Sequence, residues 1–60
     1  MTDSLYIVRR RDAFSGVYLR LMQGDHLLAT YHIRELGTAL ATGRAVSEKV
    51  GAKFEGLVNR

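Results

Sequence analysis

The chain has 60 residues, 47% of them apolar and 25% charged, which is the composition of one folded domain spanning residues 1–60 and excludes a disordered tail. It contains no cysteine, which excludes a disulfide framework and a thiolate metal site and favours the reducing cytoplasm. The formal net charge of +3 allows weak attraction to nucleic acid or to an acidic protein surface, and no apolar run is long enough to predict a membrane partner.

Three β-strands are predicted in the first half of the chain. The segments Leu5–Arg10, Val17–Met22 and Leu27–Ile33 are rich in β-branched and aromatic residues, and turn-forming residues lie between them at 12–16 and 23–25. These features predict an antiparallel meander. Pairing residues 11 and 17 across the first turn puts one apolar set on a common face: Leu5, Ile7, Val17, Leu19 and Leu21.

The second turn allows two registers. A two-residue Gly24–Asp25 turn is favoured hairpin chemistry, but it turns Thr30 and His32 toward the core. A three-residue turn, residues 24–26, turns the odd-numbered side chains of the third strand to the core instead. Because buried Thr30 and His32 would need hydrogen-bond partners, the three-residue turn is predicted. The predicted core side chains of this strand are Leu27, Ala29, Tyr31 and Ile33.

One long amphipathic helix is predicted from Glu35 to Val58. At about 100° per residue, its apolar side chains fall on one stripe. They are Leu36, Leu40, Val50, Phe54, Leu57 and Val58. A helix of this length extends about 36 Å, whereas the strands extend about 20 Å. The overhanging stripe predicts a second copy of the chain as its cover.

Glycines leave two alternatives to this continuous helix. The segment contains Gly37, Gly43, Gly51 and Gly56, each unfavourable inside a helix. The helix could stop at Gly51 and be followed by a strand over residues 53–58, or break near Gly43 with Ser47 capping a second helix. The continuous helix is the prediction. The expected fold class is therefore α+β, a three-stranded antiparallel meander with one long C-terminal amphipathic helix packed on one face (βββα).

Small side chains recur at every fourth position of the predicted helix. Ala39, Gly43, Ser47 and Gly51 form a ridge that another backbone can approach closely. Packing on the chain's own sheet is one interpretation, and a helix-to-helix homodimer is the other. The candidate dimer contacts are Gly43, Ser47, Val50 and Phe54.

The sheet face opposite the helix carries the candidate partner-binding residues. They are Tyr6, Arg10, Tyr18, Arg20, Met22 and His32. Tyrosine and arginine are enriched at binding hot spots, so this face predicts contact with a larger protein or ribonucleoprotein complex. Cross-strand pairing on a solvated face explains the same residues without a partner. In a nucleic-acid interpretation, the phosphate contacts are Arg9, Arg10, Arg11 and Arg20.

Phe14 lies alone in the first turn. It is predicted to tuck under the end of the helix, and the alternative is an exposed anchor for a partner. Arg9 and Arg11 point to the helix side of their strand and Arg10 to the other side, because successive residues alternate. The three arginines are therefore not expected to act as one flat patch.

Catalysis is not expected. His26 and His32 are about 20 Å apart on one strand, too far to share a metal ion, and no phosphate loop or nucleophile motif is present. No cofactor and no metal are predicted. The expected function is a small non-catalytic binding protein that inhibits or adapts a larger complex, such as a phage- or mobile-element-encoded inhibitor of the anti-CRISPR type. The alternatives are a nucleic-acid-binding accessory factor and a structural homo-oligomer.

Overall fold

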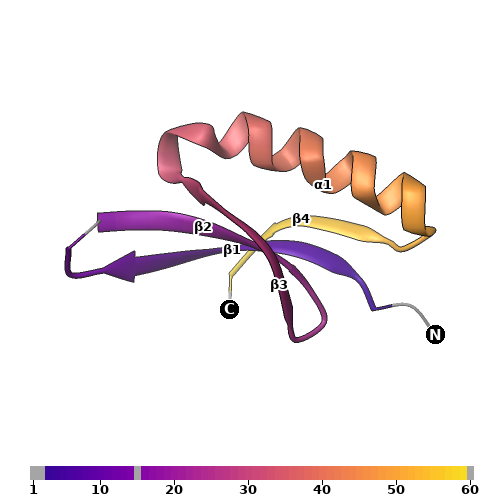
Figure 1. Ribbon diagram of the computed structural model, residues 1–60, viewed down its shortest axis with the longest axis horizontal. Helices are drawn as coiled ribbons and strands as arrows, with labels where there is room; N and C mark the ends of the chain where they lie inside the picture. The colour runs from indigo at the N-terminus through magenta and orange to yellow at the C-terminus, as the bar shows by residue number, and fades with distance from the viewer. Residues whose placement is uncertain (1–2, 15, 60) are drawn as a thin grey trace.

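A computed structural model describes residues 3–14 and 16–59 of the chain. The fold is α+β, with one helix lying across one face of a sheet (Figure 1). The elements in chain order are β1 (Leu5–Asp12), β2 (Gly16–Gln23), β3 (His26–His32), a 3₁₀ turn η1 (Ile33–Glu35), α1 (Leu36–Val50) and β4 (Phe54–Val58). The α+β class is confirmed, and the β1–β2–β3 meander is present. The predicted sheet of three strands is wrong, because a fourth strand joins it.

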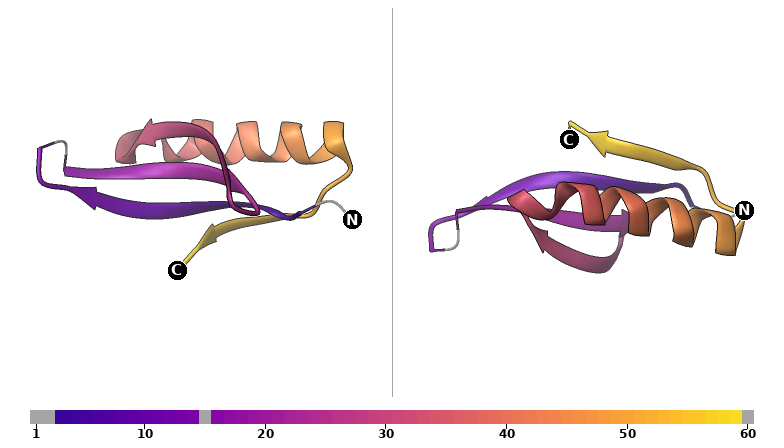
Figure 2. Two further views of the ribbon diagram at one scale, coloured as in Figure 1. Left: turned by 60° about the horizontal axis from the view of Figure 1, so that its bottom comes forward. Right: turned by 90° about the horizontal axis from the view of Figure 1, so that it is seen from above.

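The sheet has the strand order β3-β2-β1-β4. β1 pairs antiparallel with β2 and parallel with β4, so the sheet is mixed. The register of the first hairpin is the predicted one, with Arg11 opposite Val17. β1 therefore lies inside the sheet, and β3 and β4 form its two edges (Figure 2).

The helix ends at Val50, so the predicted continuous helix over residues 35–58 is wrong. Gly51 adopts a left-handed conformation with φ of 73°, and its backbone N–H donates to the carbonyl of Ser47 at 2.9 Å. The chain then turns back along β1, where the N–H of Leu5 donates to the carbonyl of Lys53 at 2.8 Å. The alternative with a stop at Gly51 and a strand after it is confirmed. A break near Gly43 is also excluded, since Gly43 lies within α1.

Because α1 ends at Val50, it does not overhang the sheet as the longer predicted helix would. α1 has 15 residues and extends about 22 Å, which matches the sheet beneath it. The apolar residues of the C-terminal segment instead form β4, where Phe54 pairs with Leu5 and Leu57 with Ile7. Pairing with β1 satisfies backbone groups that a free sheet edge would leave open, and this is the physical reason that a strand replaces the helix.

The second turn combines both of the registers that the sequence allowed. It is a two-residue turn, with Gln23 paired to His26 and Gly24 at a φ of 57°. A β-bulge between Leu21 and Met22 then adds one residue to β3, so that Ala29 and Tyr31 face the core as predicted. Leu27 does not follow the prediction. It pairs with Met22 and is 48% exposed.

The core lies between the sheet and α1. Its fully buried large side chains come from the two inner strands, and they are Leu5, Ile7, Leu19 and Leu21. Ala39 of α1 and Ala52 of the following loop complete the buried cluster. Small residues at these two positions let the backbone of the helix approach the sheet. The strand alternation that the sequence predicted is thus the alternation that builds the core.

The ridge of small residues packs on the chain's own β4. A Cβ atom at Gly43 would lie 2.5 Å from Cε1 of Phe54, so the phenyl ring occupies the space that the glycine leaves. The hydroxyl of Ser47 donates to the carbonyl of Ala52. Three of the four candidate dimer contacts, Gly43, Ser47 and Phe54, are therefore engaged within the chain, and only Val50 is largely exposed.

Replacing Gly43 by alanine is expected to lower the free energy of unfolding by about 1–3 kcal/mol, because the new methyl group displaces the Phe54 ring. Gly37→Ala is the matched control. It lies in the same helix with open space around its Cα, so it is expected to raise stability by about 0.5–1 kcal/mol. Urea denaturation followed by circular dichroism measures both changes. Equal effects of the two substitutions would show that Phe54 does not pack on Gly43.

Candidate functional site

The strand registers gather the candidate partner-binding residues on the sheet face that points away from α1, which we call the outer face. Residues that pair directly across strands share a face. They form three rows on the outer face: Arg10, Tyr18 and His32; Val8, Arg20 and Thr30; and Tyr6, Met22 and Leu27. All six candidate residues therefore lie on one surface, and the sheet brings together positions from three strands.

One of the candidate partner-binding residues on the outer face, Tyr6, is buried. Tyr6 is only 8% exposed, and its hydroxyl donates a hydrogen bond to the carbonyl of Gly24. The second turn is also held by the N–H of Gly24, which donates to the carbonyl of Ser4 at 3.2 Å. Tyr6 therefore fastens the β2–β3 turn to β1. It acts in the fold and is not an accessible contact.

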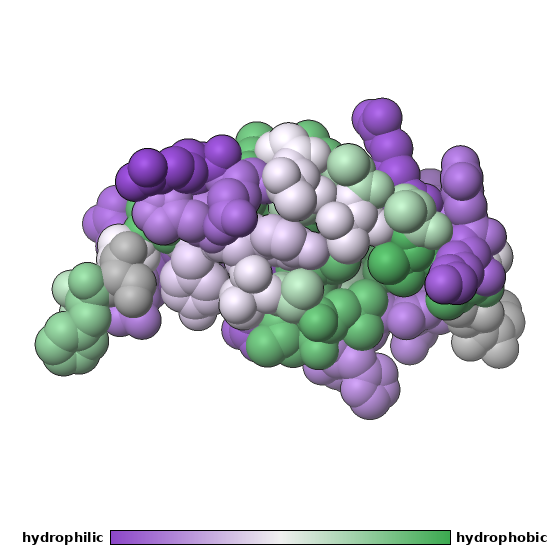
Figure 3. All heavy atoms as spheres, turned by 45° about the horizontal axis from the view of Figure 1, so that its top comes forward, coloured by the Kyte–Doolittle hydropathy of each residue, from purple (hydrophilic) through white to green (hydrophobic). Residues whose placement is uncertain are grey.

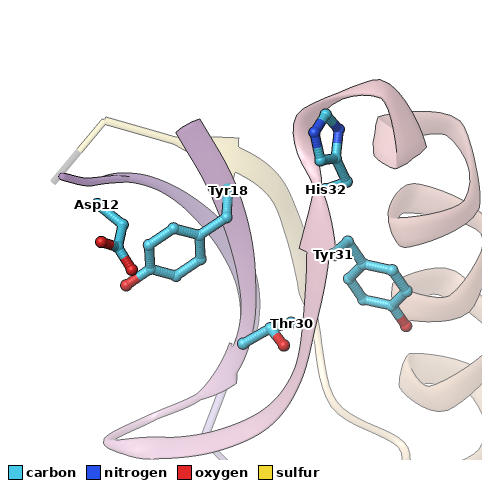
Figure 4. Close-up of a pocket in the computed structure, with 5 residues that line it drawn as sticks. All are labelled: Asp12, Tyr18, Thr30, Tyr31 and His32. Carbon is cyan, nitrogen blue, oxygen red and sulfur yellow. The ribbon is translucent and has the colours of Figure 1, made fainter. Parts of the chain in front are cut away.

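A hollow of about 360 Å³ lies at the polar end of the outer face (Figure 4). Its lining residues are Asp12, Tyr18, Thr30, Tyr31 and His32. Asp12 and Tyr18 point toward one another from neighbouring strands, whereas Tyr31 turns to the other side, toward α1. The hollow thus combines a carboxylate, an aromatic ring, a hydroxyl and an imidazole. These groups suit a flat and polar side chain of a partner molecule.

The His32 ring at the rim of this hollow is held by the start of η1. Its Nδ1 accepts a hydrogen bond from the backbone N–H of Arg34 at 3.2 Å, and Oε1 of Glu35 accepts from the N–H of His32 at 2.9 Å. This reciprocal arrangement is a capping box. It fixes the orientation of the ring, so that Nε2 is the nitrogen left to face a partner.

Sequence reasoning placed Thr30 on the outer face but named neither Thr30 nor Asp12 as a contact residue. Asp12 was explained by its turn, and the turn role is real, since its Oδ1 accepts a hydrogen bond from the N–H of Phe14 at 2.9 Å. Thr30 pairs with Arg20, and strand alternation alone is enough to place Thr30 on the outer face. The signal for Thr30 was therefore present in the sequence, whereas the position of Asp12 beside Tyr18 depends on how the strands are paired.

The arginines of β1 lie on both faces of the strand, as alternation predicts. Arg9 and Arg11 are exposed on the helix side, and Arg10 is partly buried on the outer face. Together with Val17 they border a second, smaller hollow of about 240 Å³. Arg20 lies one row further along the outer face. The four candidate phosphate contacts are therefore split between two faces and do not form one patch.

The predicted position of Phe14 under the helix is wrong. Phe14 is 99% exposed, because the β1–β2 hairpin extends past the start of α1 and its turn has nothing above it (Figure 1). The sequence alternative, an exposed aromatic residue at the turn, is the one that the structure contains.

Across residues 3–14 and 16–59, no three His, Asp or Glu side chains gather in a way that could hold a metal ion. Neither helical segment in this part of the chain has the length and hydrophobicity needed to cross a membrane.

Comparison with known proteins gives no relative: neither a protein-family model, nor a curated protein, nor a solved structure matches the chain.

Proposed function

We propose that this chain is a non-catalytic binding protein that inhibits or adapts a larger macromolecular complex, and that it docks through its outer face. The observation that supports this proposal is the hollow beside Tyr18. It combines Asp12, Thr30 and His32 with an aromatic ring on the face that α1 leaves uncovered. Ring, charge and hydroxyl groups around a concavity are the features of a hot-spot pocket.

The chemistry of the outer face fits a protein partner. Arg20 lies next to the hollow and suits a carboxylate on the partner, while Asp12 suits a lysine or arginine that enters the hollow. At the other end of the face, Met22 is partly exposed and Leu27 and Leu28 are 48% and 43% exposed. Methionine, aromatic and arginine side chains around an apolar centre are typical of protein interfaces.

The apolar end continues around the sheet edge. Figure 3 shows hydrophobic side chains gathered along the β3 side of the molecule, with hydrophilic side chains on either side of them. When a partner covers a surface of this kind, apolar side chains are removed from water, and this contributes favourably to the free energy of binding. The docking surface that we propose therefore runs from the hollow at Tyr18 to Met22 and the β3 edge.

The absence of cysteine supports a cytoplasmic location. The small size of the chain supports a phage- or mobile-element-encoded inhibitor of a bacterial nucleic-acid-handling machine, of the anti-CRISPR type.

Alanine substitutions on the outer face test the proposal. Affinity capture from an extract of the native host, with nuclease treatment, is expected to recover a partner with the unchanged protein. Tyr18→Ala and Arg20→Ala are each expected to weaken binding about 30-fold, the effect of losing a hot spot of about 2 kcal/mol.

Two variants serve as controls. Arg44→Ala removes the same charge from the exposed side of α1, so it is expected to leave binding unchanged. Tyr6→Phe keeps the buried ring but removes its hydrogen bond, so it is expected to lower stability by about 1 kcal/mol without weakening binding. Folded Tyr18→Ala and Arg20→Ala variants that bind as well as Arg44→Ala would remove the outer face as the docking surface.

A further inference from the structure

The end of the β1–β2 hairpin is a two-stranded ribbon that projects from the domain. β4 pairs with β1 only through residues 5–8, and β3 pairs with β2 only from Tyr18 onward. Only Arg11 and Asp12 of β1 and Gly16 and Val17 of β2 therefore pair with each other and with no third strand. Arg9 and Arg10 lie at the base of this two-stranded part, opposite Leu19 and Tyr18, which also pair with β3. Figures 1 and 2 show this end of the hairpin extending beyond η1 and α1 in every view. We call residues 9–14, 16 and 17 the arginine ribbon.

Positive charge lies on both faces of the arginine ribbon. Arg9 and Arg11 are exposed on the helix side, and Arg10 points to the outer face. Asp12 is the acidic residue of the ribbon, and its carboxylate accepts the N–H of Phe14. Three guanidinium groups within three successive residues give the ribbon a strong local excess of positive charge.

The tip of the ribbon carries a large apolar side chain. Phe14 is 99% exposed, the highest exposure among the large hydrophobic residues that the structure describes. Its backbone is held by the Asp12 carboxylate at 2.9 Å, so the turn presents the ring at the end of the ribbon. A ring in this position gains contacts only when something encloses the tip.

We propose that the arginine ribbon enters the major groove of double-stranded DNA. A flat partner surface contacts one face of a ribbon and leaves charge on the other face unused. A groove has phosphates along both walls, so it accepts Arg9 and Arg11 on one side and Arg10 on the other. The distribution of the arginines over two faces therefore favours a groove over a flat acidic protein surface.

The dimensions of the ribbon fit this groove. The major groove is about 12 Å wide and about 8.5 Å deep, and it admits a two-stranded β-ribbon. Residues 11–12, which have no third strand beside them, extend about 7 Å, so the tip enters most of the depth of the groove while Arg9 and Arg10 lie near the phosphates at its rim. Phe14 then meets the floor of the groove, where the thymine methyl groups offer an apolar contact. The major groove of duplex RNA is too narrow and deep for the ribbon.

This inference does not rest on the proposed function. It concerns the arginines and the tip of the ribbon, whereas the docking proposal concerns the hollow and the apolar part of the outer face. Asp12 belongs to the ribbon and also lines the hollow, but no substitution in either test changes it. The test uses purified protein and DNA alone, so its result is separate from that of the partner capture.

Fluorescence anisotropy with a labelled DNA duplex of mixed sequence, at several salt concentrations, tests the proposal. Three phosphate contacts predict that the logarithm of the binding constant falls with the logarithm of salt concentration with a slope of about −2.7. Arg9→Ala and Arg11→Ala are each expected to reduce the size of this slope by about 0.9. Arg10→Ala is expected to do the same, and Arg10→Lys to restore the slope, since lysine keeps the charge.

Phe14→Ala is expected to weaken binding severalfold at every salt concentration and to leave the slope unchanged, because it removes no charge. Arg44→Ala on α1 is the matched control and is expected to change neither quantity. Absence of binding to the duplex at low salt would overturn the proposal. So would equal effects of Arg44→Ala and the ribbon variants, or binding of single-stranded DNA or duplex RNA as tightly as duplex DNA.

Discussion

Replacing Ile7 by alanine is expected to remove most of the stability of this fold. Ile7 is fully buried at the centre of β1, opposite Leu21 on one side and Leu57 on the other. Losing a buried isoleucine side chain costs about 2–5 kcal/mol. A domain of this size has a total stability of about 3–9 kcal/mol, so the loss takes the variant close to the unfolding midpoint. Urea denaturation followed by circular dichroism measures the difference.

Leu57→Ala is the matched control for Ile7→Ala. Leu57 occupies the neighbouring position of the same row but is 49% exposed, so its substitution is expected to cost less than about 1.5 kcal/mol. An equal loss in both variants would contradict the placement of the core between α1 and the two inner strands.

A chain that ends at Lys53 is expected to lose cooperative folding. This truncation removes β4, which is the parallel partner of β1, and with it the Phe54 ring that covers Gly43. The backbone groups of residues 5–8 would then form an open edge, and the apolar stripe of α1 would lose part of its cover. The expected result is a non-cooperative melting curve, with binding of a dye that detects exposed hydrophobic surface.

A chain that ends at Asn59 is the control for the truncation, because it keeps all of β4. It is expected to melt as the full chain does. A truncated chain that melted cooperatively at an unchanged temperature would show that β1 does not need β4, and it would reopen the continuous helix as the state of the C-terminal segment.

The two departures from the predicted fold have the same physical origin. Residues 52–58 fit both a helical period and a strand period, so local pattern alone does not choose between them. The choice depends on the edge of β1, which is far away in the sequence and accepts Phe54 and Leu57 as cross-strand neighbours. Similarly, the bulge in β3 lets a two-residue turn coexist with Ala29 facing the core, an outcome that neither simple register contains.

The candidate site also has features that the sequence predicted and features that depend on contacts between distant segments. Strand alternation was enough to put Tyr18, Arg20 and His32 on one face, and pairing in the sheet confirms that they share it. Burial of Tyr6 depends on where the second turn folds back, and exposure of Phe14 depends on where α1 begins. Neither is a property of the residues next to it in the chain.

The sequence by itself determined the α+β class, the three-stranded meander, the register of the first hairpin and four of the five predicted core residues of β1 and β2, namely Leu5, Ile7, Leu19 and Leu21. The fifth, Val17, is only partly buried, because it lies where the hairpin extends past β3 and β4. Those features follow from periodicity and turn chemistry, which act over a few residues. Only the tertiary structure decided that the helix stops at Gly51, that β4 pairs with β1 and that the arginine ribbon projects. These depend on pairing between distant segments, whose free energy is gained only when the whole sheet is assembled.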